Sequence, residues 1–344
     1  MADESVRIFH LEMPLRSPFS TAGGTVDVRS VCLVRLGDEP SGWGEAAPFP
    51  GQDESMDDVL KAARAGETTP TLRAAFDEAS ADRTARIRGV SLCETIGTTM
   101  REVPISLAVG LDDPVGVVEQ AYNRGVARFK LKIAPGNVEH VAGIMARFPD
   151  LVVGVDANGS FDGETIGELS ALRDLDIVYI EQPTALPGSD EAHQLRATTE
   201  VPVFVDESVR SIADAERMLA LDSVDGVVVK PGRLGWTGAV AVREMANGSG
   251  KRWRSSGLLE TGVGRANTDI LAACPDAFVS DVAPAEWFLE ADVTESRHNN
   301  GRVTVPSGDG IGVAPDPDLL DRYLVERIDL ILNRSGVRDG GISP

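Results

Sequence analysis

Short apolar runs alternate with amphipathic stretches through the middle of the 344-residue chain. The runs are rich in β-branched residues and apolar on both faces: RFKLKI, LVVGVD, IVYIEQP, VPVFVD and GVVVKPG. Each is followed by a stretch with helical periodicity: NVEHVAGIMARF, GETIGELSALRDL, SDEAHQLRATT, IADAERMLALD and WTGAVAVREMAN. Buried strands that alternate with helices of about ten to fifteen residues indicate parallel βαβ units. The pattern therefore predicts an α/β fold.

The spacing of these runs distinguishes between two α/β architectures. Each run ends in a charged residue followed by a turn, at intervals of 24, 25, 25 and 24 residues: Lys132, Asp156, Glu181, Asp206 and Lys230. A regular period of this kind is typical of a (β/α)8 barrel, in which the C-terminal ends of the strands carry the functional groups. An open, doubly wound sheet is the alternative, but no GxGxxG motif follows the first strand of a βαβ unit. We therefore predict a (β/α)8-type TIM barrel.

The flanking segments have a different pattern and predict a second domain. Residues 1–100 contain the strand-like VRIFHLEMPL and SVCLVRLG and the helical TLRAAFDEASADRTARI, which indicate an α+β domain. We predict that the barrel occupies residues 101–290 and that 291–332 pack back on the N-terminal domain. Residues 333–344 are predicted to be a disordered tail.

Composition narrows the possible functions. The net charge of −21 argues against nucleic acid or an anionic membrane as partner, because both require a basic surface. Three cysteines without CxxC spacing indicate neither a disulfide framework nor a zinc site. The N-terminus lacks a basic segment followed by an apolar one, and no uncharged apolar run approaches the ~18 residues of a membrane span. We expect a cytoplasmic protein.

The charged strand ends predict a metal site. In a barrel, Asp156, Glu181 and Asp206 come from three consecutive strands, so their carboxylates converge at one mouth. Three carboxylates without histidine or cysteine suit Mg²⁺, or alternatively Mn²⁺, better than zinc. The lysines flank this cluster, because Lys130 and Lys132 lie on the strand before it and Lys230 on the strand after it.

Such an arrangement predicts chemistry next to a substrate carboxylate. A metal ion can bind the carboxylate and stabilise the enediolate that forms when the adjacent carbon loses its proton. A lysine can remove that proton when a neighbouring cation lowers the pKa of the amine, and the Lys130–Lys132 pair supplies such a neighbour. A single Lys-x-Lys is usually a solvated strand face, and a lone Asp at a strand end is usually a cap. Their joint occurrence at the barrel period favours the functional interpretation.

The motifs FKLKIAPG, VDANGSF, IEQP, VDES and VVVKPGRLG resemble the muconate-lactonizing branch of the enolase superfamily. Within that branch, LKIAPG, KPGRLG and LLETGVGRA are similar to the o-succinylbenzoate synthases and N-succinylamino acid racemases. The resemblance implies that Asp156, Glu181 and Asp206 bind Mg²⁺ and that Lys132 is the base, with Lys130 beside it. Lys230 would then stabilise the enediolate or act as a second acid and base.

The resemblance implies the reaction of the o-succinylbenzoate synthases, dehydration of a small anionic carboxylate to o-succinylbenzoate in menaquinone biosynthesis. Racemisation of N-succinylamino acids or epimerisation of dipeptides is the alternative. A non-catalytic metal-binding barrel is a further alternative, which α-proton exchange would exclude. The loops RSPFSTAGG (16–24) and FPGQDES (49–55) resemble segments of the family's capping domain that close over substrate. The implied substrate-binding residues are Ser20, Thr21, Gly24, Ser255, Ser256, Gly257 and Glu260, and the expected neighbours of the metal ligands are Asn158, Gln182 and Glu207.

Overall fold

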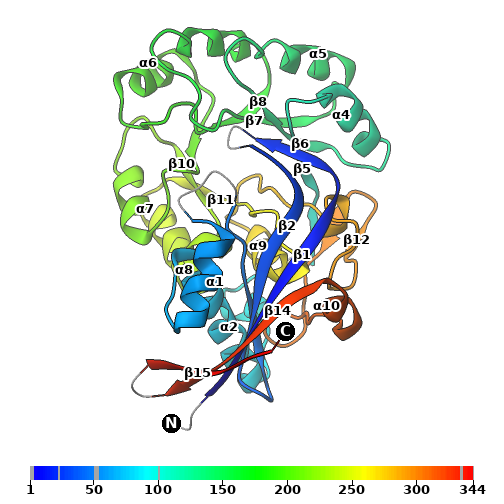
Figure 1. Cartoon of the computed structure of the whole chain (residues 1–344). Coiled ribbons are helices and arrows are strands. Elements are labelled where there is room, and N and C mark those ends of the chain that lie inside the picture. Colours follow the sequence, from blue (N-terminus) through cyan, green and yellow to red (C-terminus); the bar gives the residue numbers. More distant parts are fainter. Residues whose placement is uncertain (1–3, 22–23, 50–53, 100, 334–335, 344) are drawn as a thin grey trace.

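A computed structural model describes residues 4–21, 24–49, 54–99, 101–333 and 336–343 of the protein. Within these residues, a parallel sheet has the strand order β11-β10-β9-β8-β7-β6-β5. An antiparallel sheet has the order β15-β14-β1-β2-β3, and a small sheet has the order β12-β13-β4. Figure 1 shows the antiparallel sheet, in which blue β1 and β2 lie beside red β14 in the lower half and reach up to the level of β5 and β6.

The bounds of the elements follow the chain. The strands of the antiparallel sheet are β1 (Glu4–Thr21), β2 (Gly24–Leu36), β3 (Gly42–Ala46), β14 (Leu324–Asn333) and β15 (Gly336–Ser343). Those of the parallel sheet are β5 (Ser106–Val109), β6 (Arg128–Lys132), β7 (Val152–Asp156), β8 (Ile177–Glu181), β9 (Val203–Val205), β10 (Gly226–Val229) and β11 (Arg252–Ser255). The small sheet comprises β4 (Glu102–Pro104), β12 (His298–Asn299) and β13 (Arg302–Thr304).

The helices cover the parallel sheet and complete the N-terminal domain. The N-terminal domain carries α1 (Met56–Ala65), α2 (Pro70–Arg88) and α3 (Leu92–Thr95). The helices between and after the parallel strands are α4 (Pro114–Tyr122), α5 (His140–Arg147), η1 (Ile166–Leu172), α6 (Asp190–Thr198), α7 (Ile212–Leu219), α8 (Pro231–Gly248) and α9 (Gly262–Ala272). The last two are η2 (Ala285–Trp287) and α10 (Pro317–Tyr323).

An irregular segment, residues 278–283, closes the parallel sheet into a barrel. Its backbone bonds to β11, because Phe278 N donates to Trp253 O at 2.8 Å and Asp281 N donates to Ser255 O at 2.9 Å. It also bonds to β5 on the other side, where Ser106 N donates to Val282 O at 2.9 Å. This segment therefore occupies the eighth position of the barrel. The predicted barrel fold is confirmed, with an irregular eighth strand.

One of the expected barrel helices is a 3₁₀ helix. The stretch GETIGELSALRDL forms η1, which is preceded by a turn in which the Asp162 carboxylate accepts the N–H groups of Glu164 and Thr165. Gly163 and Gly167 lie within this stretch, and glycine is about 1 kcal/mol less favourable than alanine inside an α-helix. The amphipathic pattern was therefore correct for burial but not for helix type.

Helix α2 connects the antiparallel sheet to the barrel. On one side it contacts β3 so closely that a Cβ at Gly42 or Gly44 would overlap the helix backbone. On the other side it packs against α8. The α8 helix is interrupted at Gly235, whose φ is 73°, and there the Asp77 carboxylate of α2 accepts the N–H of Thr237 at 2.7 Å. The two domains are thus joined by the packing of α2 against α8 and by this hydrogen bond.

The end of the chain differs from the sequence prediction. Strand β14 pairs antiparallel with β1, with Ile8 opposite Ile328. Residues 336–343, predicted as part of a disordered tail, form β15, which pairs with β14. Pairing with β15 satisfies the backbone N–H and C=O groups that β14 would otherwise leave exposed. The Gly-rich terminal sequence does not by itself predict this pairing, because it depends on the position of β14 in the folded protein.

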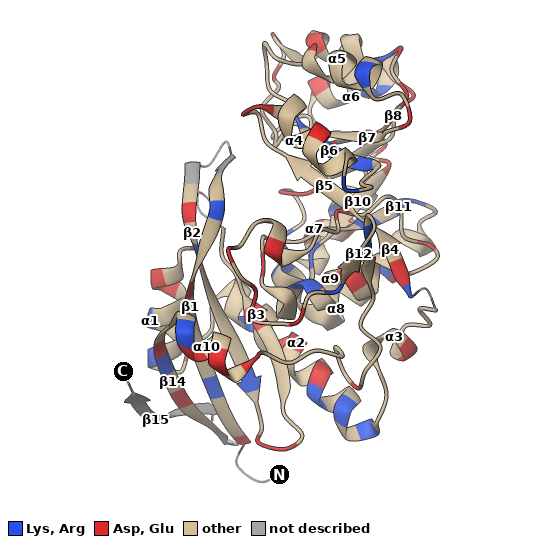
Figure 2. Cartoon of the chain, turned by 90° about the vertical axis from the view of Figure 1, so that its right-hand side faces the viewer, with Lys and Arg blue, Asp and Glu red and all other residues tan. Residues whose placement is uncertain are grey.

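Charge and hydropathy of the described residues agree with an acidic globular fold. In the view of Figure 2, acidic residues lie on elements of both domains, from α10 and β14 to α5 and α6. In the part of the chain that the structure describes, no helix is long and apolar enough to cross a membrane. The three cysteines, Cys32, Cys93 and Cys274, are buried and unbonded to one another.

Candidate active site

The strand register brings the predicted charged residues to one end of the barrel. Lys132 on β6 lies opposite Asp156 on β7, and Asp156 lies opposite Glu181 on β8. Asp206 follows the end of β9, and Lys230 follows the end of β10. Each of these side chains is positioned by the last residues of a buried parallel strand. The five residues that the sequence spacing singled out therefore lie side by side on consecutive strands.

Asp156 is bound by both lysines of the pair. Its Oδ2 atom lies 2.7 Å from Lys132 Nζ and 3.2 Å from Lys130 Nζ, while its Oδ1 accepts the N–H of Asn158 at 3.0 Å. Burial alone would raise the pKa of this carboxyl, but Lys132 and Lys130 outweigh it and hold the pKa well below its usual range. Asp156 is therefore an anion that bridges two ammonium groups.

Asp206 forms a second charged pair on the opposite side of the cluster. Its Oδ2 lies 2.7 Å from Lys230 Nζ, and its Oδ1 lies 3.0 Å from Arg233. Burial opposes ionisation, yet Lys230 and Arg233 hold the pKa of Asp206 well below its usual range. Arg233 was not predicted from the sequence, although it lies in the quoted motif KPGRLG. Its contact depends on the first turn of α8, which places position 233 beside Asp206.

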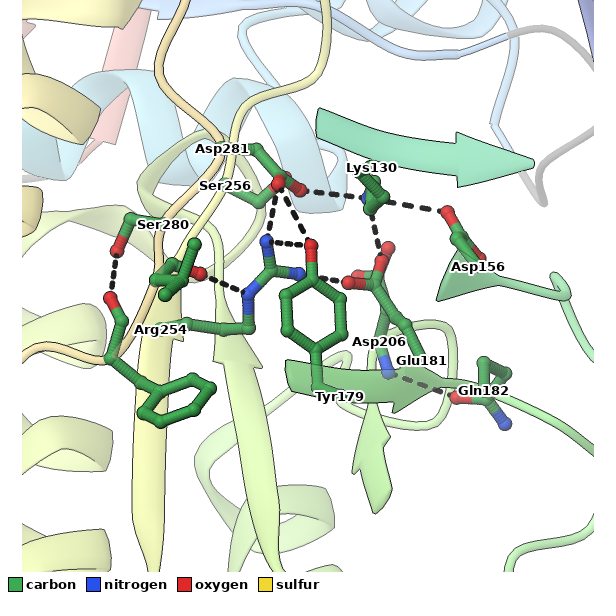
Figure 3. Close-up of polar contacts among 12 residues, drawn as sticks. Lys130, Asp156, Tyr179, Glu181, Gln182, Asp206, Arg254, Ser256, Ser280 and Asp281 are labelled. Carbon is green, nitrogen blue, oxygen red and sulfur yellow. Dashed lines mark hydrogen bonds and ion pairs between the residues drawn. The ribbon is translucent and has the colours of Figure 1, made fainter. Parts of the chain in front are cut away.

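Glu181 lies at the centre of the cluster and is fully buried. Its Oε1 accepts a hydrogen bond from Lys130 Nζ at 2.7 Å, and its Oε2 accepts one from Arg254. Burial raises the pKa of Glu181, and neighbouring Asp156 adds to the rise, while Lys130 and Arg254 lower it. Figure 3 shows these side chains converging from β6, β7, β8 and β11.

Lys130 has three carboxylate neighbours among the described residues, and one of them, Asp281, was not predicted from the sequence. Besides Asp156 and Glu181, its Nζ lies 2.8 Å from Oδ2 of Asp281, in the irregular eighth position. Burial would lower the pKa of Lys130, but Asp281, Glu181 and Asp156 together raise it well above its usual value. Its positive charge is thus balanced locally by carboxylates. Asp281 and Arg254 were both missed, because nothing in the strand pattern marks an inward Arg on β11 or an Asp in an irregular segment.

The residues that follow the carboxylates hold them in place. Asn158 Oδ1 accepts from Lys132 Nζ at 2.5 Å, and its Nδ2 donates to Glu207 Oε1 at 2.7 Å. Gln182 Oε1 accepts the N–H of Asp206 at 2.9 Å. Asn158 and Gln182 have φ angles of 46° and 40°, a region that non-glycine residues rarely adopt. Such backbone strain persists where surrounding contacts enforce it, as these side-chain bonds do.

The predicted substrate-binding residues divide into three groups. Ser256 donates to Asp281 Oδ2 at 3.1 Å, so its hydroxyl lies beside Lys130. Ser255 instead donates to Thr268 O of α9, because successive strand residues point to opposite faces and Ser255 faces outward. Its expected place beside the site is therefore not supported by its contacts. The structure describes the backbone of Ser20, Thr21 and Gly24, at the ends of β1 and β2. The side chains of Ser20 and Thr21, and residues 50–53, lie outside the described part.

The remaining predicted substrate-binding residues are Glu260 and its neighbour Gly257. Glu260 is 1% exposed, and its two carboxylate oxygens have no hydrogen-bond partner among the described residues. A Cβ at Gly257 would come within 2.5 Å of Glu260 Oε2, so the glycine makes room for this carboxyl group. Leu259 beside it has a φ of 62°. The loop after β11 thus carries a buried acid in a strained segment.

The three predicted metal ligands have the donor chemistry that Mg²⁺ prefers. Among the described residues, no three acidic, histidine or cysteine side chains surround one common point. Lys130 contacts both Asp156 and Glu181, and Arg254 contacts both Glu181 and Asp281. Glu181 and Asp156 nevertheless lie side by side at the barrel mouth and are both buried, which is costly unless cations compensate. The residues present fit a divalent cation by type and by their common location.

A parallel barrel with carboxylates at three consecutive strand ends, lysines on both flanks and a separate α+β domain is the architecture of the enolases and their relatives. The chain belongs to the enolase superfamily, because residues 116–319 match the family described as Enolase C-terminal domain-like. The chain is 28% identical to an o-succinylbenzoate synthase of Bacillus subtilis, covering 94% of this chain and 97% of that protein. It is 31% identical to an N-succinylamino acid racemase of an Amycolatopsis species, with 94% and 98% covered.

Solved structures agree with this assignment. An enolase superfamily protein from Listeria innocua superposes with a TM-score of 0.84 at 26% identity, covering 97% of this chain and 100% of the other. A dipeptide epimerase from Cytophaga hutchinsonii, solved with Mg and the dipeptide D-Ala-L-Val, superposes with a TM-score of 0.85 at 22% identity, covering 96% and 100%. The predicted superfamily and fold are therefore confirmed.

Proposed function

We propose that this protein is an o-succinylbenzoate synthase that removes water from 2-succinyl-6-hydroxy-2,4-cyclohexadiene-1-carboxylate, a step of menaquinone biosynthesis. The observation that carries the proposal is the placement of Lys132 and Lys230 on opposite sides of three buried carboxylates. Relatives named o-succinylbenzoate synthase over nearly the full chain length support the choice of reaction.

Lys132 is the base in this proposal. Among the described residues, its Nζ contacts one carboxylate, Asp156, together with Asn158, whereas three carboxylates surround Lys130 and raise the pKa of its amine. Asn158 and Asp156 hold the Lys132 amine at the barrel mouth. Because its carboxylate neighbours stabilise the ammonium form of Lys130, Lys130 is the poorer base, and Lys132 is the better candidate of the pair.

The reaction can use a single residue first as the general base and then as the general acid. Lys132 takes the proton from the carbon next to the ring carboxylate, and the electron pair moves toward that carboxylate. The C–O bond to the ring hydroxyl then breaks, and the Lys132 ammonium returns the proton to the departing oxygen as water. The products are o-succinylbenzoate and water, with no net change at Lys132.

The remaining charged groups stabilise the negative charge that develops on the substrate carboxylate. A Mg²⁺ ion held by Asp156, Glu181 and Asp206 would act as a Lewis acid for that carboxylate. Lys230, fixed by Asp206 at 2.7 Å, contributes a positive charge from the other side of the cluster. A strongly acidic chain can bind a small anionic substrate in this way because Lys132, Lys230 and Arg233 supply positive charge at the barrel mouth.

A racemase or epimerase is the second candidate, and the symmetry of the two lysines favours it. Lys132 and Lys230 each lie 2.7 Å from one carboxylate, with side chains that are 14% and 9% exposed. Two lysines in equivalent positions can remove a proton from one face of an α-carbon and return it from the other. The relatives named N-succinylamino acid racemase and hydrophobic dipeptide epimerase are consistent with this reaction.

The two candidates are separated by direct assay. The purified chain is incubated with Mg²⁺ and 2-succinyl-6-hydroxy-2,4-cyclohexadiene-1-carboxylate, and product formation is followed by absorbance, with EDTA as control. We expect fast turnover that EDTA abolishes and that added Mg²⁺ restores. Folded, Mg²⁺-supplied protein that does not turn over this substrate would refute the synthase proposal. Exchange of the α-proton of N-succinylamino acids or dipeptides in D₂O would then support the second candidate.

A further inference from the structure

A fully buried arginine, Arg254, lies beneath the carboxylate cluster and takes no part in the predicted site. It comes from β11, where Trp253 and Ser255 face outward and Arg254 faces into the barrel. Its exposed fraction is 0%. Burying a guanidinium group is costly unless its N–H groups are bonded to acceptors, so its bonds show what it supports.

The guanidinium of Arg254 bonds in four directions. Nη1 donates to Oε2 of Glu181, and Nη2 donates to Oδ1 of Asp281 and, at 2.7 Å, to the hydroxyl of Tyr179. Nε donates to Val279 O at 2.7 Å, and the guanidinium lies 4.0 Å from the centre of the Tyr179 ring. Figure 3 shows the guanidinium between Glu181 and Asp281, against the face of Tyr179. The group is therefore held from every side.

Arg254, Glu181, Lys130 and Asp281 form a closed ring of alternating charge, which we call the charge ring. Each carboxylate gives one oxygen to Arg254 and the other to Lys130. Glu181 uses Oε2 for Arg254 and Oε1 for Lys130 at 2.7 Å. Asp281 uses Oδ1 for Arg254 and Oδ2 for Lys130 at 2.8 Å. The four residues are at most 7% exposed, and their formal charges sum to zero.

The charge ring fixes the orientation of one proposed metal ligand. Because the rigid fork of Arg254 binds Oε2 of Glu181, the carboxylate cannot rotate without breaking a buried ion pair. Oε1 is the oxygen turned toward Lys130 and, through it, toward Asp156. Asp281 in turn holds Arg254 and Lys130 at a fixed separation. The two other proposed ligands, Asp156 and Asp206, are not members of the ring. Asp156 is held by Lys132 at 2.7 Å and also contacts Lys130 at 3.2 Å, and Asp206 is held by Lys230.

We propose that Arg254 and Asp281 are positioning residues that fix Glu181, through the charge ring, in the orientation required to bind a divalent cation. This inference rests on the proposed function only for the existence of the cation site and not for the identity of the substrate. It assigns the ring a role in cation affinity, in addition to any role in folding. Neither residue touches the reacting atoms in this assignment.

The substitution Arg254→Met tests the proposal, because the loss of charge and the loss of orientation change cation affinity in opposite directions. Arg254→Met removes a positive charge next to the site, so simple electrostatics predicts tighter binding of a cation. Loss of orientation predicts weaker binding, because residues that orient metal ligands typically contribute roughly 10- to 100-fold in affinity. The double variant Arg254→Met with Asp281→Asn keeps the net charge of the ring unchanged, so its affinity reports orientation alone.

The experiment is a Mn²⁺ titration of the full chain without substrate, with free Mn²⁺ measured by electron paramagnetic resonance. We expect the dissociation constant to rise roughly 10- to 100-fold in the double variant, and to rise in Arg254→Met as well. Arg254→Lys should bind with intermediate affinity, because one ammonium keeps the charge but cannot form the fork. Arg243→Met is the matched control: this arginine pairs with Asp276 and lies over the ring of outward-facing Trp253, so Mn²⁺ affinity should not change.

Each outcome decides the proposal. Wild-type affinity in the double variant, tighter binding in Arg254→Met, or an equal loss in Arg243→Met would overturn it, and so would absence of Mn²⁺ binding in the wild-type chain. If Arg254→Met does not fold, the double variant and Arg254→Lys provide the same comparison. Failure of the proposed function is seen separately, as wild-type protein that binds Mn²⁺ and does not turn over the substrate.

Discussion

Replacing Glu45 by Gln should change how the stability of the protein depends on pH. Glu45 lies on β3 of the N-terminal domain and is 0% exposed. Its carboxylate accepts hydrogen bonds from Thr261 N at 2.9 Å, Thr261 Oγ1 at 2.6 Å and Gly264 N at 2.9 Å, at the N-terminus of barrel helix α9. It therefore links the N-terminal domain to the loop after β11 that carries Glu260.

The size of the change in the free energy of unfolding follows from the pKa of the Glu45 carboxyl group. Burial raises the pKa of Glu45 from 4.5 to about 7, against the hydrogen bonds from Thr261 and Gly264, which lower it. The folded state thus holds the proton more tightly than the unfolded state. The resulting stabilisation is complete below pH 4.5 and is lost as the pH rises through 7. The difference corresponds to about 3 kcal/mol at about 1.4 kcal/mol per pH unit, of which about 2 kcal/mol falls between pH 5.5 and 8.5.

Urea unfolding at a series of pH values between 5.5 and 8.5 measures this effect. Glu45→Gln removes the ionisation, so the free energy of unfolding of the variant, relative to wild type, should improve by about 2 kcal/mol across this range. A constant offset from lost hydrogen bonds does not alter that change. Glu67→Gln, at an exposed position after α1, is the control and should give a curve parallel to wild type. If the curve for Glu45→Gln is also parallel to wild type, the reasoning about Glu45 is refuted.

Three further predictions concern the site and the barrel core. Lys132→Met should reduce elimination by at least the roughly 10²- to 10⁴-fold that a general base contributes and should abolish α-proton exchange, and appreciable turnover would exclude Lys132 as base. Lys230→Met should also impair elimination, and if it eliminates well but loses exchange at one face of the α-carbon, the racemase assignment gains support. Gly154→Ala should lower the free energy of unfolding by about 1–3 kcal/mol in urea titrations, since the added Cβ would overlap the ring of Tyr179. Gly143→Ala, in α5 with open space around it, should instead be neutral or stabilising, and equal losses in the two variants would contradict the overlap argument.

The strand ends could be predicted from the sequence because their chemistry and spacing repeat. Parallel strands buried on both faces are continuous apolar runs, and a period of 24 or 25 residues places their C-terminal ends at one mouth. The register of the barrel agrees, with Lys132, Asp156 and Glu181 directly opposite one another. The resemblance to known motifs then supplied the roles of individual residues, which spacing alone does not distinguish.

Other parts of the site have no local signature. Arg254 and Trp253 are adjacent charged and aromatic residues on a short strand, and only the closed barrel decides which of them faces inward. Asp281 lies in a segment whose backbone bonds to β11 and β5 although it forms no regular strand, so no alternating pattern marks it. Glu45 is separated from its partner Thr261 by 216 residues.

The sequence by itself determined the barrel, the order of its strands and the set of carboxylates and lysines at its mouth, because each depends on short-range periodicity. The tertiary structure decided how these charges are paired. Lys130 contacts Glu181, Asp281 and Asp156, whereas Lys132 and Lys230 each pair with one strand-terminal aspartate. The physical reason is that buried charges must be compensated by whichever opposite charge lies within bonding distance, and that distance is set by barrel closure and not by separation along the chain.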